Sequence, residues 1–499
     1  MRKNNKKIIL EDVAVTDYAA EGKALAKIEG KVIFIAGAVP GDVADIMLTK
    51  NKKDWAEGRV LKIKEYSTSR VDPFCMHFGV CGGCKWQMLP YEKQLQYKQQ
   101  EAEQNLIRIG KVTDATFLPI AGAAETVYYR NKLEFTFSNK RYLTAPPHAE
   151  GEASPNPSEG GALDAAVSND YSNPLGIQIP PSGSGGASGA LGYHAPRIFD
   201  KIIDIQECYL MDNVNNVIRN TIRDFAVAQG FSFYDIRLHT GWLRNIIIRY
   251  CSTGELMINI CLNFEEEKDR ILLLDHVLKE VPGITTLLYT INPKWNDSIY
   301  DLTPQVYFGK GYVVEKLEEY EFIISPKSFF QTNTKQAEKL YGITRDFAGL
   351  TGNEIVYDLY CGTGSIGIFI SKLARKIIGV EAIEEAIEDA KKNAALNNIN
   401  HAVFSAGDVI KICNDEFFAT HGRPDVVITD PPRVGMHEKL VIKLLQMEAP
   451  RIVYVSCNTA TQARDILLLS EKYRVEKIQP VDMFPHTHHI ESVALLILK

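Results

Sequence analysis

The chain lacks both a long apolar run and an excess of positive charge. Nowhere in its 499 residues does an uninterrupted apolar stretch reach the roughly 18 residues that a membrane-spanning helix requires. The formal net charge is −6 at pH 7, so the chain as a whole does not attract nucleic acid, and any RNA-binding face must be a local basic patch. A hydrophobic content of 45% and a charged content of 24% are ordinary for a soluble globular protein.

A secretory signal is also missing from the first residues. The basic start leads only into Ile8-Ile-Leu10, which is too short for the apolar core of a signal peptide. We therefore expect a cytoplasmic protein with no membrane partner, and we expect it to act as a monomer. In a reducing compartment its nine cysteines should be free thiols or metal ligands rather than disulfides.

Three parts follow one another along the chain, which predicts an α/β protein of three domains. Residues 1–66 carry short β-like runs between glycine-bearing turns, which indicates a small antiparallel β-barrel. Residues 67–324 mix strands and helices less regularly, and we interpret them as a central α+β domain. Residues 325–499 alternate short apolar runs with helical segments, the pattern of buried parallel strands joined by crossover helices.

A low-complexity stretch at residues 143–190 interrupts the central part. It is too poor in bulky apolar residues to offset its ordering entropy, so we expect it to be disordered. The flanking residues 131–137 and 192–205 both look like strands. The stretch is therefore expected to decorate the tip of a hairpin, and function should survive its deletion.

A basic cluster in the first part is a candidate RNA-contact surface. Lys50, Lys52, Lys53 and Arg59 lie close in sequence to Trp55, whose ring could stack on a base. The other interpretation is a solvated loop around one structural tryptophan, and the sequence leaves both open.

A glycine-rich loop at residues 358–367 is the first sign of a cofactor site. Gly362, Gly364 and Gly367 have the G-x-G-x-x-G spacing, which lets the backbone approach a ligand closely and would suit NAD as well. Glu381 ends the next strand, where it could bind a ribose diol.

The turn Asp430-Pro-Pro-Arg433 decides between the two cofactors. It ends the fourth predicted strand of this part, where class I methyltransferases place a motif that lines the site of methyl transfer. Many amino-methylating enzymes have an aromatic residue after the proline pair, whereas Arg433 occupies that position here. S-adenosylmethionine is therefore favoured over NAD, with a target atom other than an exocyclic amine.

Cys457 and Glu491 are the candidate catalytic pair. Cys457 follows the apolar run Arg451–Ser456, at the expected carboxyl end of a strand, and Glu491 stands immediately before the last apolar run. A thiolate that adds to C6 of a pyrimidine makes C5 nucleophilic, and a base must later remove the C5 proton so that the thiolate can leave. A buried structural cysteine is the alternative.

The C-terminal motifs together resemble the RNA uracil-C5 methyltransferase family. They appear in order as Ser328-Phe-Phe-Gln-Thr-Asn333, Asp358–Gly367, Asp430-Pro-Pro-Arg-Val-Gly435, Val455-Ser-Cys-Asn458 and His489-Ile-Glu491. The resemblance implies that Cys457 is the nucleophile and Glu491 the proton acceptor. It also implies S-adenosylmethionine contacts, which we assign to Gln331, Tyr360, Gly362, Gly364, Glu381 and Asp430. Gln331 is nominated by the resemblance alone, and Phe329 beside it could either stack on RNA or join the core.

A second group of cysteines predicts a metal centre. Cys75-x5-Cys81-x2-Cys84 places three thiols within ten residues, and Cys208 follows downstream. Four thiolates suit a tetrahedral Zn or an iron–sulfur cluster. The spacing differs from the C-x3-C-x2-C pattern of radical S-adenosylmethionine enzymes. The remaining cysteines read as structural: Cys251, Cys261, Cys361 and Cys413.

The cysteine pattern resembles one branch of the family. It is similar to that of members that act on 23S ribosomal RNA, which carry a [4Fe-4S] cluster and often an N-terminal TRAM barrel. We therefore expect uracil C5 in 23S ribosomal RNA as the target and a [4Fe-4S] cluster rather than Zn. The alternatives are a transfer RNA uracil, cytosine C5 in RNA, or a non-catalytic RNA-binding assembly factor. His486, His488 and His489 have no further ligands nearby in sequence, so we expect one of them to shape the base pocket rather than to bind a catalytic metal.

Overall fold

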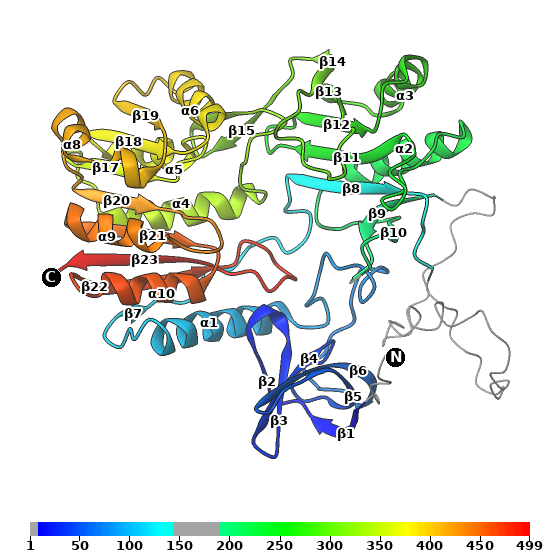
Figure 1. Ribbon diagram of the computed structural model, residues 1–499, viewed down its shortest axis with the longest axis horizontal. Helices are drawn as coiled ribbons and strands as arrows, with labels where there is room; N and C mark the ends of the chain where they lie inside the picture. The colour runs from blue at the N-terminus through cyan, green and yellow to red at the C-terminus, as the bar shows by residue number, and fades with distance from the viewer. Residues whose placement is uncertain (1–7, 144–188, 197) are drawn as a thin grey trace.

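Three sheets organise the chain in the computed structural model, which describes residues 8–143, 189–196 and 198–499 (Figure 1). Most of the stretch expected to be disordered, residues 144–188, lies outside the described residues. Its flanks are neighbouring antiparallel strands, in which Ser138 pairs with Ala190 and Thr136 with Gly192. Within the described residues, no helix is both long and apolar enough to cross a membrane.

The N-terminal part is a curved six-stranded sheet with the order β1-β5-β6-β4-β3-β2. The expectation of an antiparallel unit holds for all of its pairings except that of β4 with β6, which run parallel. Alternate residues such as Ile33 and Ile35 face its small core. Its elements are β1 (Ile9–Ala14), β2 (Asp17–Tyr18), the 3-10 turn η1 (Ala20–Gly22), β3 (Ala24–Ile28), β4 (Lys31–Ala36), β5 (Val43–Asn51) and β6 (Trp55–Glu65).

The central part is a mixed seven-stranded sheet with two helices, followed by a hairpin. The strand order is β10-β9-β8-β11-β12-β13-β14, and β12 is buried along its whole length. The elements are β8 (Lys132–Ser138), β9 (Ala190–His194), β10 (Ile202–Asp204), α2 (Val214–Ala228), β11 (Leu243–Tyr250), β12 (Leu256–Leu262), α3 (Glu267–Glu280), β13 (Ile284–Ile291), β14 (Gln305–Gly309), and the hairpin strands β15 (Val313–Leu317) and β16 (Tyr320–Ile324).

The C-terminal part is an eight-stranded sheet with the order β19-β18-β17-β20-β21-β23-β22-β7. The five strands from β19 to β21 are parallel, whereas β23 runs antiparallel between β21 and β22. The strands are β7 (Thr116–Phe117), β17 (Ile355–Leu359), β18 (Lys376–Glu381), β19 (Ala402–Ala406), β20 (Val426–Thr429), β21 (Arg451–Ser456), β22 (Tyr473–Val481) and β23 (Glu491–Leu498).

Helices cover both faces of this sheet because its strands are apolar on both sides. Val356 and Val453 face one core, whereas their neighbours Tyr357 and Ile452 face the other. The first core is covered by α4 (Thr334–Ala348), α5 (Ser365–Ile370) with the 3-10 turn η2 (Ser371–Leu373), and α6 (Glu384–Leu396). The second is covered by α1 (Tyr91–Arg108), α7 (Val409–Ile412), α8 (Asp415–His421), α9 (Glu438–Met447) and α10 (Thr459–Leu469).

The segment that contains α1 and β7 crosses the boundary that the sequence pattern suggests. The sequence groups residues 91–117 with the central part, whereas in the structure α1 packs beside α10 and β7 extends the C-terminal sheet (Figure 1). Leu106 of α1 is fully buried in the second core of that sheet. The C-terminal sheet therefore takes an edge strand and a covering helix from the chain that follows the N-terminal barrel.

Candidate functional site

Cys457 and Glu491 come from the ends of two neighbouring strands. β21 and β23 pair antiparallel up to Ser456 opposite Ser492, so the next residue outward on each strand is Cys457 and Glu491 respectively. Asn458 ends β21 because its side chain caps α10, accepting hydrogen bonds from Ala460 N at 3.0 Å and Thr461 N at 3.4 Å. Glu491 is the first residue of β23 rather than the residue before it. The structure thus brings the predicted nucleophile and base to one edge of the sheet.

The surroundings of this pair favour its neutral form. Burial raises the pKa of the Cys457 thiol to about 11, with Glu491 and Asp430 adding to the rise and Arg433 opposing it. Burial, followed by the charge of Asp430, raises the pKa of Glu491 well above its usual range. Burial likewise raises the pKa of Asp430 to about 7. These mutual effects place all three acidic groups in one poorly solvated site.

The glycine loop takes backbone conformations that favour glycine. Gly362 has φ 53° and Gly364 has φ 77°, and a Cβ on Gly364 would lie 3.0 Å from the ring of Phe404. Tyr360 also has a positive φ, 63°, which turns the chain away from β17. Gly362 N donates a hydrogen bond to Glu381 Oε2 at 3.3 Å, so Glu381 lies at the loop as predicted.

Asp358 is a further site residue to which the sequence pattern assigned no role. It is fully buried, and its Oδ2 accepts a hydrogen bond from Gly367 N at 2.9 Å. Its Oδ1 has no hydrogen-bond partner among the described residues, and burial raises its pKa to about 7. Asp358 therefore ties β17 to the first turn of α5, next to the glycine loop. Its place as the first polar residue of the motif, ahead of the glycines, is the signal that could have identified it.

Gln331 lies on the loop between β16 and α4. It is half-buried, and its backbone carbonyl accepts a hydrogen bond from Asn131 Nδ2 at 3.0 Å. Phe330 beside it is buried against Phe322, whereas Phe329 is 70% exposed. The core alternative for Phe329 is therefore wrong, and its ring is free to contact another molecule.

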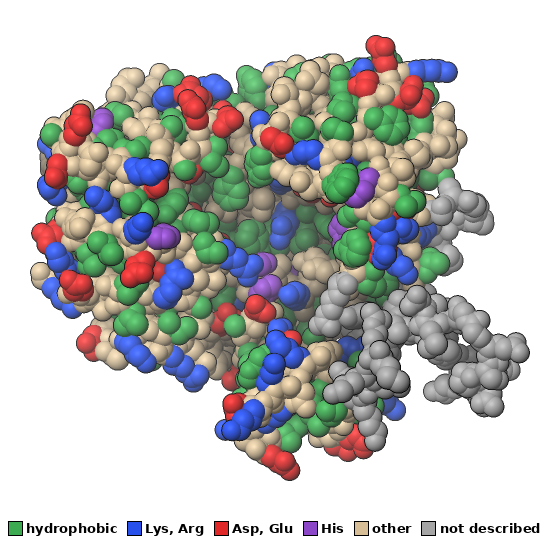
Figure 2. Space-filling model, viewed as in Figure 1, with side chains coloured by type: hydrophobic (Ala, Val, Ile, Leu, Met, Phe, Trp, Pro, Cys, Tyr) green, Lys and Arg blue, Asp and Glu red, His purple; other side chains and the backbone are tan. Residues whose placement is uncertain are grey.

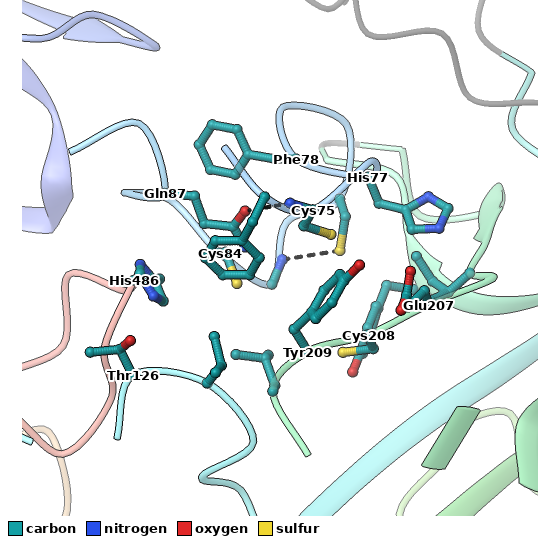
Figure 3. A pocket seen from close by; sticks show the side chains of 17 residues that line it. Cys75, His77, Phe78, Cys84, Gln87, Thr126, Glu207, Cys208, Tyr209 and His486 are labelled. Carbon is teal, nitrogen blue, oxygen red and sulfur yellow. Dashed lines mark hydrogen bonds between the residues drawn. The ribbon is translucent and has the colours of Figure 1, made fainter. Parts of the chain in front are cut away.

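The four predicted cluster cysteines line one cavity. Cys75, Cys81 and Cys84 come from the loop before α1, and Cys208 comes from the loop before α2 (Figure 3). All four are free thiols. Burial raises the pKa of Cys75 to about 11 and that of Cys84 to about 12, with the other cysteines of the cavity adding to the rise.

All four thiols line the walls of this cavity. Among the described residues, no group of three or more His, Cys, Asp or Glu side chains is arranged to hold a single metal ion. Gly83 N donates a hydrogen bond to Cys81 Sγ at 3.4 Å, and Cys75 N donates to Gln87 Oε1 at 3.2 Å (Figure 3). Tyr209 and His486 also face the cavity, so it is enclosed by the central part and by the loop before β23.

The three histidines, one of which is expected to shape the base pocket, lie on that loop and are kept neutral by burial. Burial lowers the pKa of His486 and of His489 to about 4 each, and that of His488 to about 3. His486 has a positive φ, 63°, and its carbonyl accepts hydrogen bonds from the backbone N–H groups of Lys85 at 2.8 Å and Trp86 at 3.1 Å. His486 therefore joins the loop that carries Glu491 to the loop that carries Cys84.

In the N-terminal sheet, the basic cluster around Trp55 is partly engaged. Lys50 Nζ lies 4.5 Å from the centre of the Trp55 ring, and Phe34 contacts the same ring edge-on at 6.3 Å. The indole is half-buried, at the start of β6. Both interpretations of the cluster, an RNA contact and a structural tryptophan, remain compatible with this packing.

Comparison with known proteins gives two family matches and full-length relatives. Residues 303–499 match the family described as tRNA (Uracil-5-)-methyltransferase, and residues 11–61 match the TRAM domain. A protein from Bacteroides thetaiotaomicron described as an uncharacterized RNA methyltransferase is 49% identical over 484 residues, covering 96% of this chain and 100% of the relative. A protein of the same description from Porphyromonas gingivalis is 46% identical, covering 97% and 99%.

Among solved structures, the chain is similar to the tRNA (uracil-54, C5)-methyltransferase of Pyrococcus abyssi in complex with S-adenosyl-L-homocysteine. The match has a TM-score of 0.70 and 25% identity, and it covers 98% of this chain and 100% of that one. The likeness therefore extends over the N-terminal and central parts as well as the C-terminal sheet.

Proposed function

Since the chain belongs to the family of S-adenosylmethionine-dependent RNA (uracil-5-)-methyltransferases, we propose that it methylates uracil C5 in 23S ribosomal RNA, with Cys457 as nucleophile and Glu491 as proton acceptor. The observation that carries the catalytic assignment is the pairing of β21 with β23, which puts both residues at adjacent strand ends. Asp430, at the end of β20 on the other side of β21, completes the edge at which parallel α/β sheets bind ligands.

The two residues supply complementary steps. The Cys457 thiolate adds to C6 of uracil, forming a sulfur–carbon bond and moving the electron pair of the double bond toward C5. S-adenosylmethionine supplies the methyl group that C5 then takes up. The Glu491 carboxylate removes the proton from C5, and the released electron pair restores the C5–C6 double bond as the thiolate leaves. A carboxylate with a raised pKa is a stronger base, which suits abstraction of a proton from carbon.

Residues around the glycine loop fit the methyl donor. The open space beside Gly362, and the hydrogen bond from Gly362 N to Glu381, are the structural features that support this. We propose that Glu381 accepts hydrogen bonds from the ribose hydroxyls. Tyr360, Gln331 and Asp430 are proposed to complete the contacts. Asp430 was predicted from the sequence as one of these contacts. It acts on the pKa of Cys457, and a cofactor bound to Asp430 would therefore have its methyl group near the target base.

Trapping of the covalent intermediate tests the nucleophile. RNA that contains 5-fluorouridine at the target should form an adduct with the wild-type protein, because fluorine at C5 cannot leave as a proton. The adduct should be absent from Cys457→Ala and should form normally with Cys413→Ala, which removes a buried thiol at the end of α7, remote from the site. Methylation by Cys457→Ala at the wild-type rate would refute the assignment.

We propose that Cys75, Cys81, Cys84 and Cys208 hold a [4Fe-4S] cluster. A cluster binds each thiolate at a separate iron, so it needs sulfurs spread around a cavity, whereas tetrahedral Zn needs them within about 2.3 Å of one point. The cavity that all four thiols line supports a shared metal centre, and the choice of the cluster over Zn rests on the resemblance of the cysteine pattern. Anaerobic purification should yield a brown protein with visible thiolate–iron absorption, and a colourless protein loaded with zinc would overturn the proposal.

The choice of ribosomal RNA rests on the cysteine set together with the TRAM domain. A transfer RNA target is the second candidate, because the similar structure from Pyrococcus abyssi is described as a tRNA methyltransferase. Figure 2 shows a hollow where the three parts meet, with Lys, Arg and His side chains at its rim, which suits a folded RNA of either kind. Mass spectrometry of 5-methyluridine in ribosomal and transfer RNA from a deletion strain separates the two.

The third possibility, an RNA-binding assembly factor without catalysis, is tested in the same strain. Complementation with Cys457→Ala should restore RNA binding but not the missing methyl group. If the mutant restored every phenotype and no nucleotide differed between strains, a binding role would replace the catalytic one.

A further inference from the structure

A second pocket lies between the N-terminal sheet and α1. It is formed by Tyr18 and the η1 turn on one side, and by Trp86 and one face of α1 on the other. Including its mouth it encloses about 410 Å³, part of which is open solvent. The α1 residues that line it are spaced at helical intervals along a single face: Tyr97, Gln100, Glu101, Gln104 and Asn105.

The lining combines aromatic rings with unused hydrogen-bonding groups. Tyr18 contacts both Trp86 and Tyr97 at tilted or edge-on angles, with ring centroids 5.3 and 4.6 Å apart. In the part of the chain that the structure describes, the side-chain amide of Gln104 and the carboxyl of Glu101 make no hydrogen bond. The indole N–H of Trp86, which is 1% exposed, also has no partner there. Burial raises the pKa of Glu101 to about 7, so near neutral pH this group both donates and accepts hydrogen bonds.

The pocket is close to the catalytic edge. Asn105, at its end, donates a hydrogen bond from Nδ2 to Thr459 Oγ1 at 2.8 Å, and Thr459 is two residues after Cys457. On the other side, a Cβ on Gly22 would lie 3.2 Å from Trp86 Nε1 and 2.9 Å from His488 Cβ, so the η1 turn sits directly on the loop that carries Glu491. The pocket therefore adjoins both the start of α10, next to Cys457, and the loop that carries Glu491.

The charges around the pocket suit an RNA strand that passes near it. Lys85 is the neighbour of Trp86, and its pKa is lowered by burial first and also by the nearby cations Lys23 and Arg433. Lys85 and Arg433 are near enough to affect each other and can neutralise phosphates, whereas Lys23 is paired with Glu21 and Glu57. The pocket itself has no cation in its lining and contains a carboxyl group, so it suits a flat, neutral, hydrogen-bonding ring better than a phosphate.

We propose that the pocket between the η1 turn and α1 binds a second nucleobase of the RNA substrate, one unstacked from the strand beside the target uracil. The half-buried rings of Tyr18 and Tyr97 offer a stacking surface for any base, and the amide of Gln104 with the carboxyl of Glu101 can read a base edge. This inference rests on the proposed function, since it requires RNA as the substrate. It adds a site that selects the nucleotides around the target.

A scan of abasic RNAs tests the pocket through a double-mutant cycle. The bases near the target uracil are removed one at a time, and binding is measured by fluorescence anisotropy with wild type and with Gln104→Leu. For wild type, one position other than the target should weaken binding by about 5- to 100-fold, the range expected for one stacked base. With Gln104→Leu the intact RNA should bind about tenfold more weakly. Removal of the base at that one position should then weaken binding by a smaller factor than it does for wild type.

Two further variants sharpen the result. Tyr97→Ala should behave like Gln104→Leu at the same abasic position, whereas Gln96→Leu, on the same helix but outside the pocket, should leave every penalty unchanged. The salt dependence of binding should be the same for Gln104→Leu as for wild type, because no phosphate contact is lost, and should become shallower for Lys85→Ala. Thermal unfolding of each variant shows that it is folded.

The outcomes separate this inference from the proposed function. If removal of each base weakens binding by the same factor in wild type and in both pocket variants, while wild type still forms the Cys457 adduct, the pocket is not a base site. If wild type forms no adduct with any RNA, the proposed catalytic function fails, and a surviving abasic cycle would still support the pocket.

Discussion

The thiol of Cys457 is held neutral by its surroundings, so its reactivity should depend steeply on pH. Its pKa is raised to about 11, chiefly by burial. The thiolate is the reactive form, and below the pKa its fraction rises about tenfold per pH unit. Alkylation of Cys457 by iodoacetamide, followed by mass spectrometry of its peptide, should therefore accelerate by about that factor per unit between pH 7 and 10.

Arg433 supplies the control for this pH dependence. Its guanidinium lowers the pKa of Cys457, in opposition to Glu491 and Asp430. Arg433→Gln should therefore raise the pKa and slow alkylation at any fixed pH below 10, whereas Asp430→Asn should accelerate it. A rate that is independent of pH across this range would contradict the assignment of a raised pKa.

Gly364 is the residue at which a single methyl group should disrupt the cofactor loop. It combines φ 77° with a Cβ position 3.0 Å from the ring of Phe404. Gly364→Ala should lower the free energy of unfolding by about 1–3 kcal/mol through backbone strain. It should also weaken S-adenosylmethionine binding by about tenfold, a change of roughly 1.4 kcal/mol measurable by calorimetry.

Gly342 is the matched control because it lies in α4 with no heavy atom within 4 Å of its Cβ position. Gly342→Ala should leave cofactor affinity unchanged and stabilise the helix by about 0.5–1 kcal/mol. Equal effects of the two substitutions would show that the strain at Gly364 does not matter.

At the scale of elements, a buried ion pair fastens α1 to the loop before β23. Lys98 Nζ lies 2.6 Å from Asp482 Oδ1, both side chains are fully buried, and Tyr91 donates a hydrogen bond to the other oxygen of Asp482 at 2.8 Å. Removing one partner leaves a buried charge unpaired, so Lys98→Met should destabilise the protein by about 3–5 kcal/mol in urea unfolding. It should also slow methylation, since Glu491 follows this loop.

The double variant Lys98→Met/Asp482→Asn separates lost charge from lost packing. It removes both charges and should recover part of the stability that the single variant loses. If the double variant were less stable than the sum of the two single variants predicts, the pair would not be the cause of the loss.

The sequence predicted the strands of the C-terminal sheet closely because each is a short apolar run between turn residues. The apolar run Arg451–Ser456 matches β21 residue for residue. The positions of Cys457 and Glu491 followed from these strand ends. Their adjacency did not follow from the pattern, because it depends on β23 inserting antiparallel between β21 and β22.

Other contacts between distant segments could not be predicted either, because they depend on how strands far apart in the sequence pair in the folded sheet. β7 is only two residues long, Thr116–Phe117, and is a strand because it pairs with Lys477 and Ile478. The parallel pairing of β4 with β6 is likewise set by the fold of the sheet, since residue alternation is the same for parallel and antiparallel neighbours. The unpartnered Oδ1 of Asp358 depends on burial that no local sequence reveals.

At the scale of the whole molecule, the cysteine cavity is where separate parts of the chain meet. Its lining comes from the loop at residues 74–87, from the loop at residues 205–210 and from His486. If the four cysteines hold a cluster, metal binding stabilises the folded protein and ties these loops together.

Cys208→Ser should then lower Tm and increase hydrogen exchange at residues 75–89 and at residues 484–490, near Glu491. Cys251→Ser removes a buried thiol of the same part outside the cavity, so it should leave exchange in both loops unchanged. Chelation of iron from the wild-type protein should reproduce the exchange pattern of Cys208→Ser. Protection that is unaffected by either treatment would mean that the cavity holds its shape without metal, and that protein contacts such as those of His486 with Lys85 and Trp86 suffice to position the loop carrying Glu491.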